Sequence, residues 1–248
     1  MRILGIIPAR YASSRLPGKP LVDIGGRSML QRVHERAILA RSLDRVVVAT
    51  DDDRVRSHAE GFGAEVVMTS PDHPSGTDRC MEALSGTEGA FDAVVNVQGD
   101  EPFLDPGQID LISEALRDPE AGIVTLAKAI ISDSELDDPG EAHVVVDKDR
   151  NALYFSRSAL PYLRDPVDGQ RHKEFPFLKH VGIYGYKVEV LSRIVALGPS
   201  LLERAEDLEQ LRWLENGFRI RIAMTAHEGF CVDTEADLEE ARRRVGAL

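Results

Sequence analysis

Short apolar runs alternate with amphipathic segments through the first half of the chain. Residues 2–9 are nearly all apolar, whereas residues 28–40 place Met29 and Val33 at helical spacing behind Ser28, a candidate N-cap. Continuous apolar strands that are separated by helices are typical of a parallel sheet covered on both faces. The pattern therefore predicts an α/β fold with a mostly parallel, doubly wound sheet. Strands are expected at residues 2–9, 45–50, 64–69, 91–98 and 121–130, and helices at residues 28–40, 51–63, 75–84 and 105–117.

The pattern changes after about residue 130. Residues 143–157 suit an antiparallel hairpin that turns at residues 148–151, and residues 161–177 form a long polar loop with three prolines. We interpret the region of about residues 130–190 as an antiparallel insert in a single domain of 248 residues. The remaining elements are expected to be strands at residues 179–188 and 219–226 and helices at residues 201–217 and 234–245, the last capped by Thr234.

Length, charge and cysteine content narrow the class of protein. A chain of 248 residues can bury a substantial core, and its formal net charge of −12 argues against nucleic acid or an anionic membrane surface as a partner. No stretch approaches the ~18–20 apolar residues of a membrane span, and the N-terminal apolar run is too short for a secretory signal. Cys80 and Cys231 lack metal-like spacing, so we expect reduced thiols in a soluble cytoplasmic protein.

The loop after the first expected strand concentrates positive charge. Arg10, Arg15 and Lys19 lie in "PARYASSRLPGKPL", and Arg27 follows shortly after. Ligands of an open parallel sheet bind at the carboxyl ends of its strands, where Arg and Lys side chains can hold phosphate groups. The loop matches neither a P-loop nor a dinucleotide fingerprint, and an exposed polar loop is the alternative. We therefore predict that this loop binds a polyphosphate.

Two carboxylates follow other strand-like segments. Asp100 lies in "NVQGDEP" and Asp233 in "FCVDTEADL". A carboxylate beyond a buried strand is costly unless it is paired or bound to a metal, and its oxygens suit Mg²⁺. Helix capping is the alternative, by Asp105 in the first segment and by Asp233 or Thr234 in the second. Together the two carboxylates predict a magnesium clamp for phosphoryl or nucleotidyl transfer.

Seven motifs occur in the order found in one enzyme family. They are "IIPARYASSRLPGKPL", "SGTDR", "NVQGDEP", "ALYFSRSALPY", "HVGIYGY", "LEQLRWLE" and "VDTEADL". With them the chain resembles the CMP-Kdo synthetases (3-deoxy-manno-octulosonate cytidylyltransferases) over essentially its whole length. The resemblance implies a Rossmann-like nucleotidyltransferase fold and an enzyme that couples CTP to the anomeric hydroxyl of the acid sugar Kdo, giving CMP-Kdo and pyrophosphate. It also implies Mg²⁺ as the cofactor and a homodimer.

The resemblance also implies roles for individual residues. The catalytic set would be Arg10, Lys19, Asp100 and Asp233, with the two aspartates as metal ligands. The nucleotide would be bound by Arg10, Arg15, Lys19, Ser75, Gly76, Arg79 and Gln98. The acid sugar would be bound by Gln98, His143, Arg164, His180, Tyr184 and Gln210. Structural alternatives are a hydrogen-bonded core role for His180, a core or interface role for Tyr184, and a dimer face on the helix that carries Gln210 and Trp213.

Two departures from the family pattern concern the acceptor. Gly140 replaces the usual Asn, and His143 replaces the usual Lys and so removes a fixed cation from the expected acceptor side. Because relatives within the resembled family use other acids, the resemblance implies 8-amino-Kdo and a small phosphonate as the alternative acceptors. Two other classes are a non-catalytic nucleotide-binding module, which would not need both aspartates, and an NAD-dependent oxidoreductase, which the missing glycine fingerprint disfavours.

Overall fold

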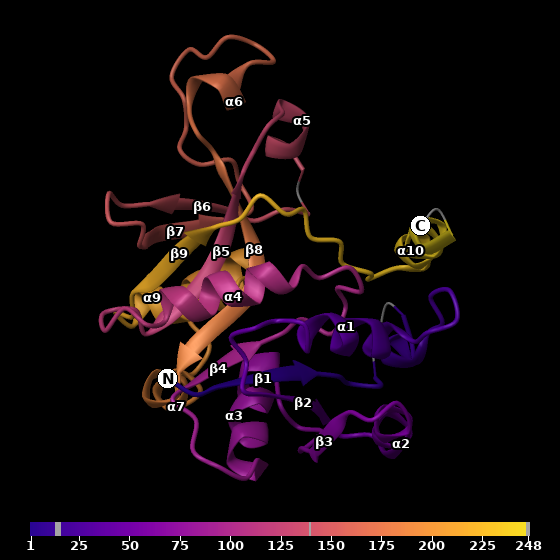
Figure 1. Ribbon diagram of the computed structural model, residues 1–248. Coiled ribbons are helices and arrows are strands. Elements are labelled where there is room, and N and C mark those ends of the chain that lie inside the picture. The colour runs from indigo at the N-terminus through magenta and orange to yellow at the C-terminus, as the bar shows by residue number, and fades with distance from the viewer. Residues whose placement is uncertain (13–15, 139, 247–248) are drawn as a thin grey trace. The chain divides into compact units, whose positions relative to one another are not determined.

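The computed structural model describes residues 1–12, 16–138 and 140–246, which form two compact units (Figure 1). Unit 1 contains residues 1–114 and 229–248, and unit 2 contains residues 115–228. The end of the chain therefore returns to the unit in which it begins. Arg15, one of the predicted phosphate ligands, lies outside the described residues.

Unit 1 is built on a parallel sheet. Its strands are β1 (Ile3–Pro8), β2 (Arg45–Thr50), β3 (Glu65–Met68) and β4 (Ala93–Asn96), in the order β3-β2-β1-β4. In β1, Ile6 pairs with Val47 of β2 on one side and with Asn96 of β4 on the other. Ile6 and its neighbour Ile7 are fully buried. The apolar run of β1 is thus buried on both faces, as expected for a strand inside a parallel sheet.

Two helices of unit 1 begin at the N-caps that the sequence predicted for them. The helices of unit 1 are α1 (Met29–Ala37), α2 (Asp53–Gly61), α3 (Gly76–Gly86), α4 (Pro106–Ala115) and α10 (Glu235–Gly246), and the opening loop ends in a 3-10 turn, η1 (Lys19–Leu21). The hydroxyl of Ser28 accepts a hydrogen bond of 3.1 Å from the backbone N–H of Gln31. The hydroxyl of Thr234 accepts one of 3.2 Å from the backbone N–H of Asp237. Both predicted N-caps are confirmed.

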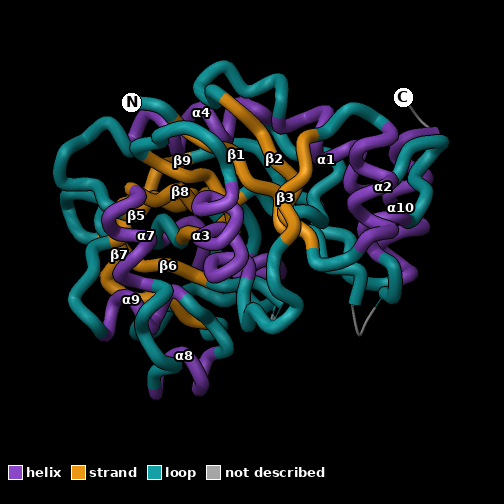
Figure 2. Tube along the Cα trace, turned by 90° about the horizontal axis from the view of Figure 1, so that it is seen from below, coloured by secondary structure: helices purple, strands orange, loops and turns teal. Residues whose placement is uncertain are grey.

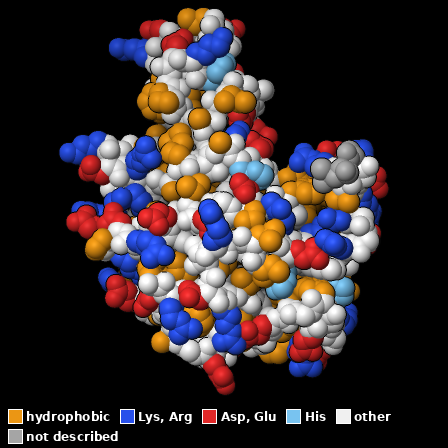
Figure 3. All heavy atoms as spheres, in the orientation of Figure 1, with side chains coloured by type: hydrophobic (Ala, Val, Ile, Leu, Met, Phe, Trp, Pro, Cys, Tyr) orange, Lys and Arg blue, Asp and Glu red, His pale blue; other side chains and the backbone are white. Residues whose placement is uncertain are grey.

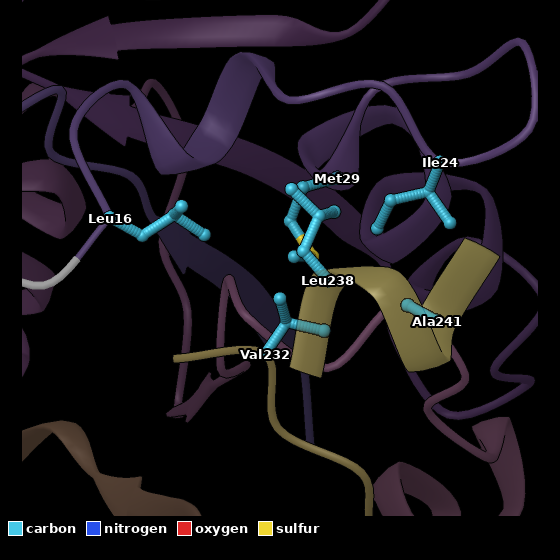
Figure 4. Close-up of a cluster of buried hydrophobic side chains, with 6 residues drawn as sticks. All are labelled: Leu16, Ile24, Met29, Val232, Leu238 and Ala241. Atoms are coloured by element: carbon cyan, nitrogen blue, oxygen red, sulfur yellow. The ribbon is translucent and has the colours of Figure 1, made fainter. Parts of the chain in front are cut away.

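The beginning and the end of unit 1 share a buried apolar cluster (Figure 4). Its side chains are those of Leu16, Ile24, Met29, Val232, Leu238 and Ala241, each at most 6 % exposed. Burial of a large aliphatic side chain contributes about 1.5–3 kcal/mol to stability. Because Leu16 lies in the opening loop and Val232 precedes α10, the cluster holds these two segments together. It thereby brings Asp233 next to Lys19, 214 positions earlier in the chain.

Unit 2 combines antiparallel and parallel strand pairs. Its strands are β5 (Ile123–Ala129), β6 (His143–Val146), β7 (Ala152–Ser156), β8 (Leu178–Lys187) and β9 (Ile220–Met224), drawn in orange in Figure 2. Strand β5 pairs antiparallel with β8 and parallel with β9. Strands β6 and β7 form the predicted antiparallel hairpin. The prediction of an α/β fold that combines parallel strands with antiparallel ones is therefore confirmed.

The structure differs from the predictions in the helices of unit 2. Short helices that were not predicted are α5 (Asp133–Leu136), α6 (Arg171–Glu174) and α7 (Val188–Ile194). The helix predicted at residues 201–217 is divided into α8 (Leu201–Glu206) and α9 (Gln210–Glu215). Asp207 ends α8 in a left-handed conformation with a φ of 53°, which a continuous right-handed helix does not contain. Unit 2 extends beyond the insert expected at about residues 130–190, and the single-domain interpretation stays a prediction.

The surface mixes charges of both signs. Figure 3 shows acidic and basic side chains interspersed on the face in view. The acidic excess of the chain is therefore spread out on that face rather than gathered in one patch. Within residues 1–12, 16–138 and 140–246, no helix is both long and apolar enough to cross a bilayer.

Candidate active site

The carboxyl ends of β1 and β4 border a cavity of about 710 Å³. Its walls come from the end of β1, the opening loop, the segment after β4 and the segment before α10. This edge of an open α/β sheet is where ligands bind. The lining includes five of the predicted site residues, namely Arg10, Lys19, Gln98, Asp100 and Asp233. The remaining lining residues are Pro8, Ala9, Ala12, Pro20 and Gly99.

Gly99 allows a close approach of two backbone segments at this cavity. A Cβ at this position would lie 2.6 Å from the carbonyl oxygen of Pro8, which is closer than side chains tolerate. The two segments follow β1 and β4, which are paired in the sheet. The glycine therefore lets the stretch that carries Gln98 and Asp100 pass directly beside the end of β1.

Lys19 links the two predicted metal ligands. Its ammonium donates one hydrogen bond of 2.8 Å to Oδ2 of Asp100 and another of 2.8 Å to Oδ1 of Asp233. Burial by itself lowers the pKa of Lys19, but the charges and hydrogen bonds of the two carboxylates outweigh burial and raise this pKa above 10.5. An ammonium has three donors, and the described residues accept two of them, which leaves one for a ligand. We predicted Lys19 as a phosphate ligand, and its bridge between the aspartates is an additional finding.

Asp100 and Asp233 together fit a divalent cation. Each directs one carboxylate oxygen at the same point, where the ammonium of Lys19 already shows that positive charge is stabilised. Mg²⁺ is commonly bound by one or two carboxylates, and water and phosphate oxygens complete its shell. The part of the chain that the structure describes holds no group of three or more His, Cys, Asp or Glu side chains suited to a metal. The pair therefore fits a divalent cation whose other ligands would come from water and a bound phosphate.

Glu101 is a buried acidic residue next to the site, and we did not single it out from the sequence. It is buried directly after Asp100, and the thiol of Cys231 lies 3.7 Å from its Oε1. Burial and the negative charge of Asp100 raise the pKa of Glu101 to about 7. At neutral pH this carboxyl group is therefore protonated in a large fraction of the molecules, which limits the negative charge beside Asp100. The sequence signal for it is the acidic pair in "GDEP" after a buried strand.

Three predicted nucleotide contacts belong to the start of α3. Ser75 is the N-cap of this helix and Gly76 its first residue. Arg79 is buried, lies 3.2 Å from Oδ1 of Asp51 and donates a hydrogen bond to the hydroxyl of Thr69, so it ties α3 to the ends of β2 and β3. Burial lowers the pKa of Arg79, and the charge of Asp51 opposes this effect. These three residues are not among the described residues that line the cavity, and their contacts with a nucleotide stay predictions.

His180 and Tyr184 lie on β8 of unit 2, beside a bulge in its pairing with β5. The hydroxyl of Thr125 lies 3.0 Å from Nε2 of His180, and the rings of His180 and Tyr184 are 5.4 Å apart. Tyr184 also packs edge-on against Trp213 at 5.2 Å. Burial lowers the pKa of His180 to about 3, so its ring is neutral at neutral pH. These contacts agree with the structural roles considered above, and the roles of both residues toward an acceptor stay predictions.

His143 is 1 % exposed at the start of β6. Neither of its ring nitrogens has a hydrogen-bond partner among the described residues, and burial lowers its pKa. The residue paired with it on β8 is Lys179, which lies 3.0 Å from Glu141 and 2.6 Å from Glu228. The histidine is therefore neutral at neutral pH, and a lysine charge lies on the neighbouring strand.

Gln210 and Arg164 complete the acceptor residues predicted in unit 2. Gln210 is buried at the start of α9, and Arg164 is exposed in the loop between β7 and α6. Leu211 and Trp213 of α9 are buried. Leu214 of the same helix is only half-buried, and Leu201 and Leu202 of α8 are exposed, so a dimer face on the segment predicted as one helix stays a prediction.

Comparisons with known proteins identify the family. The sequence model of the family described as cytidylyltransferase matches residues 4–222. The chain is 48 % identical over 244 residues to a 3-deoxy-manno-octulosonate cytidylyltransferase of Bacteroides thetaiotaomicron, and the alignment covers 97 % of each protein. It is 45 % identical over 249 residues to an 8-amino-3,8-dideoxy-manno-octulosonate cytidylyltransferase of Shewanella sp. (strain ANA-3), with 99 % of each protein covered.

Comparison with a solved structure indicates the same family. The chain is similar to a CMP:2-keto-3-deoxy-manno-octonic acid synthetase in complex with CTP, with a TM-score of 0.92 and 43 % identity over 100 % of this chain and 99 % of that one. The predicted family is thus confirmed by a family model and by close relatives that match nearly the whole chain. The chain belongs to the cytidylyltransferase family, in the group of the 3-deoxy-manno-octulosonate cytidylyltransferases.

Proposed function

We propose that this protein couples CTP to Kdo. The anomeric hydroxyl oxygen of the sugar bonds to the α-phosphorus of CTP while the bond to the β-phosphate oxygen breaks, which gives CMP-Kdo and pyrophosphate. The observation that carries the proposal is the cavity at the ends of β1 and β4, where Arg10, Lys19, Asp100 and Asp233 converge. Full-length similarity to enzymes named for this reaction supports it. A binding module without catalysis would not need two aspartates beside these cations.

Arg10 and Lys19 bind the triphosphate in this proposal. Arg10 directly follows β1 and lines the cavity, and Lys19 has a donor beyond those that it gives to the two aspartates. Their positive charges reduce the repulsion between the triphosphate and the incoming sugar oxygen. Positioning and electrostatics of this kind carry most of the acceleration in phosphoryl transfer. Arg15 remains a further expected ligand.

Asp100 and Asp233 would hold Mg²⁺. When bound, this ion neutralises phosphate charge and lowers the pKa of a nearby hydroxyl group. The two aspartates also fix the ammonium of Lys19 at the cavity wall through hydrogen bonds of 2.8 Å. Glu101, with its pKa of about 7, adds only part of a negative charge beside them at neutral pH.

The residues proposed to bind the acceptor are those that the family resemblance implies. Arg164 is the cation proposed for the carboxylate of Kdo, because an Arg side chain binds carboxylates through two parallel hydrogen bonds. His180 is neutral, so it suits a hydrogen bond with a sugar hydroxyl rather than a charge contact. Tyr184 and Gln210 are further hydrogen-bonding candidates.

Kdo is the acceptor that we propose for this site. His143 was expected to remove a cation from the acceptor side and so to disfavour Kdo. Lys179, which is paired with it across the strands, does not replace this cation, because its ammonium lies 3.0 Å from Glu141 and 2.6 Å from Glu228. We propose Kdo because proteins named for this acceptor match nearly the whole chain.

The protein is also proposed to be a cytoplasmic homodimer. Hydrophobic side chains gather over the part of unit 2 that carries α5 and α6, at the top of Figure 3. The exposed apolar residues of unit 2 include Ile131 at 72 %, Val167 at 56 % and Tyr162 at 89 %. Exposed apolar groups that are gathered in one place favour a protein interface. Light scattering coupled to size-exclusion chromatography should give twice the mass of the chain, and a monomer mass would contradict the dimer.

The activity is tested with purified protein, CTP, Kdo and Mg²⁺. Pyrophosphate release should require all three additions, and the product should have the mass of CMP-Kdo. Parallel reactions with 8-amino-Kdo and a small phosphonate compare kcat/KM among acceptors, and we expect the largest value for Kdo. Folded protein that forms no CMP-Kdo, or that prefers another acceptor, would contradict the proposal.

A further inference from the structure

Arg54, near the start of α2, lies over the aromatic ring of Tyr11. The guanidinium carbon is 3.4 Å from the ring centroid. Asp52 also binds this guanidinium, accepting hydrogen bonds of 3.0 Å from Nε and 2.6 Å from Nη2. Asp52 is also the N-cap of α2, because it accepts a hydrogen bond from the backbone N–H of Arg54. The guanidinium above Tyr11 is therefore anchored to the start of α2 in unit 1.

Tyr11 in turn contacts the far end of the opening loop. The backbone N–H of Gly18 donates a hydrogen bond of 3.2 Å to the carbonyl oxygen of Tyr11. Gly18 has a φ of 69°, and a Cβ there would lie 3.3 Å from the hydroxyl oxygen of Tyr11. Both the left-handed backbone and the tight contact favour glycine at this position. Tyr11 and Gly18 thus close the base of the loop.

Each cavity-lining cation is the chain neighbour of one of these two residues. Arg10 precedes Tyr11, and Lys19 follows Gly18. We propose that Tyr11 and Arg54 are positioning residues, which form an aromatic–cation clamp that holds Arg10 and Lys19 in the geometry required to bind the triphosphate of CTP. The proposal rests on the assignment of this cavity to CTP.

The clamp acts through the loop rather than by direct contact with the nucleotide. Neither Tyr11 nor Arg54 is among the described residues that line the cavity. Asp52 also balances the charge of Arg54. The hydrogen-bonded guanidinium of Arg54 lowers the pKa of Asp52 to about 2. An arginine that is paired in this way is a weak phosphate ligand, but it still attracts the face of an aromatic ring.

The test measures kcat and KM for CTP in the full-length protein with Kdo and Mg²⁺. Arg54→Gln removes the cation above the ring, Tyr11→Leu removes the ring, and Tyr11→Phe retains it. Arg56→Gln is the matched control, because Arg56 also lies on α2 and pairs with a neighbouring aspartate, Asp53, at 3.0 Å. Circular dichroism establishes that each variant is folded.

Arg54→Gln should raise KM for CTP about two- to five-fold, as expected for a cation–π contact at an exposed site. Tyr11→Leu should raise it at least as much, and Tyr11→Phe should restore most of the wild-type value. Arg56→Gln should match the wild type. A purely structural role would change stability without this pattern in KM.

The double variant Tyr11→Leu/Arg54→Gln separates positioning from direct contact. Its KM should equal that of Tyr11→Leu alone, because Arg54 then has no ring to hold. If Arg54→Gln raises KM in the Tyr11→Leu background as much as it does in the wild type, Arg54 contacts CTP directly. That result would overturn the clamp. A folded Tyr11→Leu protein with the wild-type KM would overturn it as well, provided that Lys19→Ala raises KM. If Lys19→Ala also left KM unchanged, the assignment of this cavity to CTP would fail together with the clamp.

Discussion

Replacement of Lys19 by Met should destabilise the protein and increase its affinity for Mg²⁺ in the absence of nucleotide. The ammonium of Lys19 makes two charge-assisted hydrogen bonds of 2.8 Å, one to Asp100 and one to Asp233. A methionine has a similar length but no charge. In the variant the two carboxylates would therefore face each other without a cation between them.

The size of the effect follows from the solvent exposure of the three side chains. Lys19 is 13 % exposed, Asp100 27 % and Asp233 33 %. A charge-assisted hydrogen bond contributes about 1.5–3 kcal/mol when it is buried, and partial exposure reduces that value. The two bonds together should therefore contribute about 2–3 kcal/mol to the free energy of unfolding. For a chain of this size, the loss corresponds to a decrease of about 5–10 °C in Tm.

Thermal unfolding at neutral pH, first with EDTA and then with increasing Mg²⁺, measures both effects. The wild type should respond weakly to Mg²⁺ alone, because the ammonium already lies between the carboxylates. Lys19→Met should gain stability with Mg²⁺, since a ligand that binds the folded state raises Tm. Lys148→Met is the control, because Lys148 is exposed in the turn between β6 and β7 and should behave like the wild type.

Two results would refute this reasoning. An unchanged Tm in Lys19→Met would mean that the two ion pairs contribute no stability. A destabilised variant whose response to Mg²⁺ equals that of the wild type would mean that the aspartates do not bind the metal.

Three further changes test other parts of the structure. Gly99→Ala should lower Tm and raise KM for CTP, because its Cβ would lie 2.6 Å from the carbonyl oxygen of Pro8 and overpacking costs about 1–3 kcal/mol. Arg79→Met should lower the free energy of unfolding in urea by about 3–5 kcal/mol, because it leaves Asp51 without its buried partner, and a negligible loss would argue against this structural tie. Burial lowers the pKa of His180 to about 3, so the unfolded state binds more protons between that pH and the ordinary pKa of 6.5. The contribution of His180 to the free energy of unfolding should therefore fall by about 2 kcal/mol from pH 7 to pH 5. In urea titrations at both pH values, His180→Asn should lose about 2 kcal/mol less than the wild type between pH 7 and pH 5.

The parallel strands of unit 1 were predictable because each is a nearly continuous apolar run. The caps at Ser28 and Thr234 were predictable because their hydroxyl groups directly precede helical spacing. The break at Asp207 was not, because the apolar spacing continues across it and the left-handed conformation depends on the local cap. The short helices of unit 2 were missed because a few turns carry too little periodicity to be recognised.

The meeting of Asp100 and Asp233 was predicted from strand-like segments before both residues, but the structure supports this reason only for Asp100, which follows β4. Residues 225–234 contain no strand, so Asp233 lies at the end of an irregular segment that directly precedes α10. The place of Lys19 between the two aspartates could not be predicted. It depends on the packing of Leu16 against Val232 and their neighbours, which join the two ends of the chain. Glu101 was missed because adjacent carboxylates give no indication of which one is buried.

The turnover of Asp100→Asn at saturating CTP and Kdo, with Mg²⁺ present, tests the central claim most directly. Asparagine preserves the size of the side chain but removes the charge that is proposed to hold the metal. We predict that CTP binding, measured by calorimetry, changes by no more than a few-fold, while kcat for pyrophosphate release falls about a hundredfold or more. A folded Asp100→Asn protein that releases pyrophosphate at the wild-type rate would contradict the account.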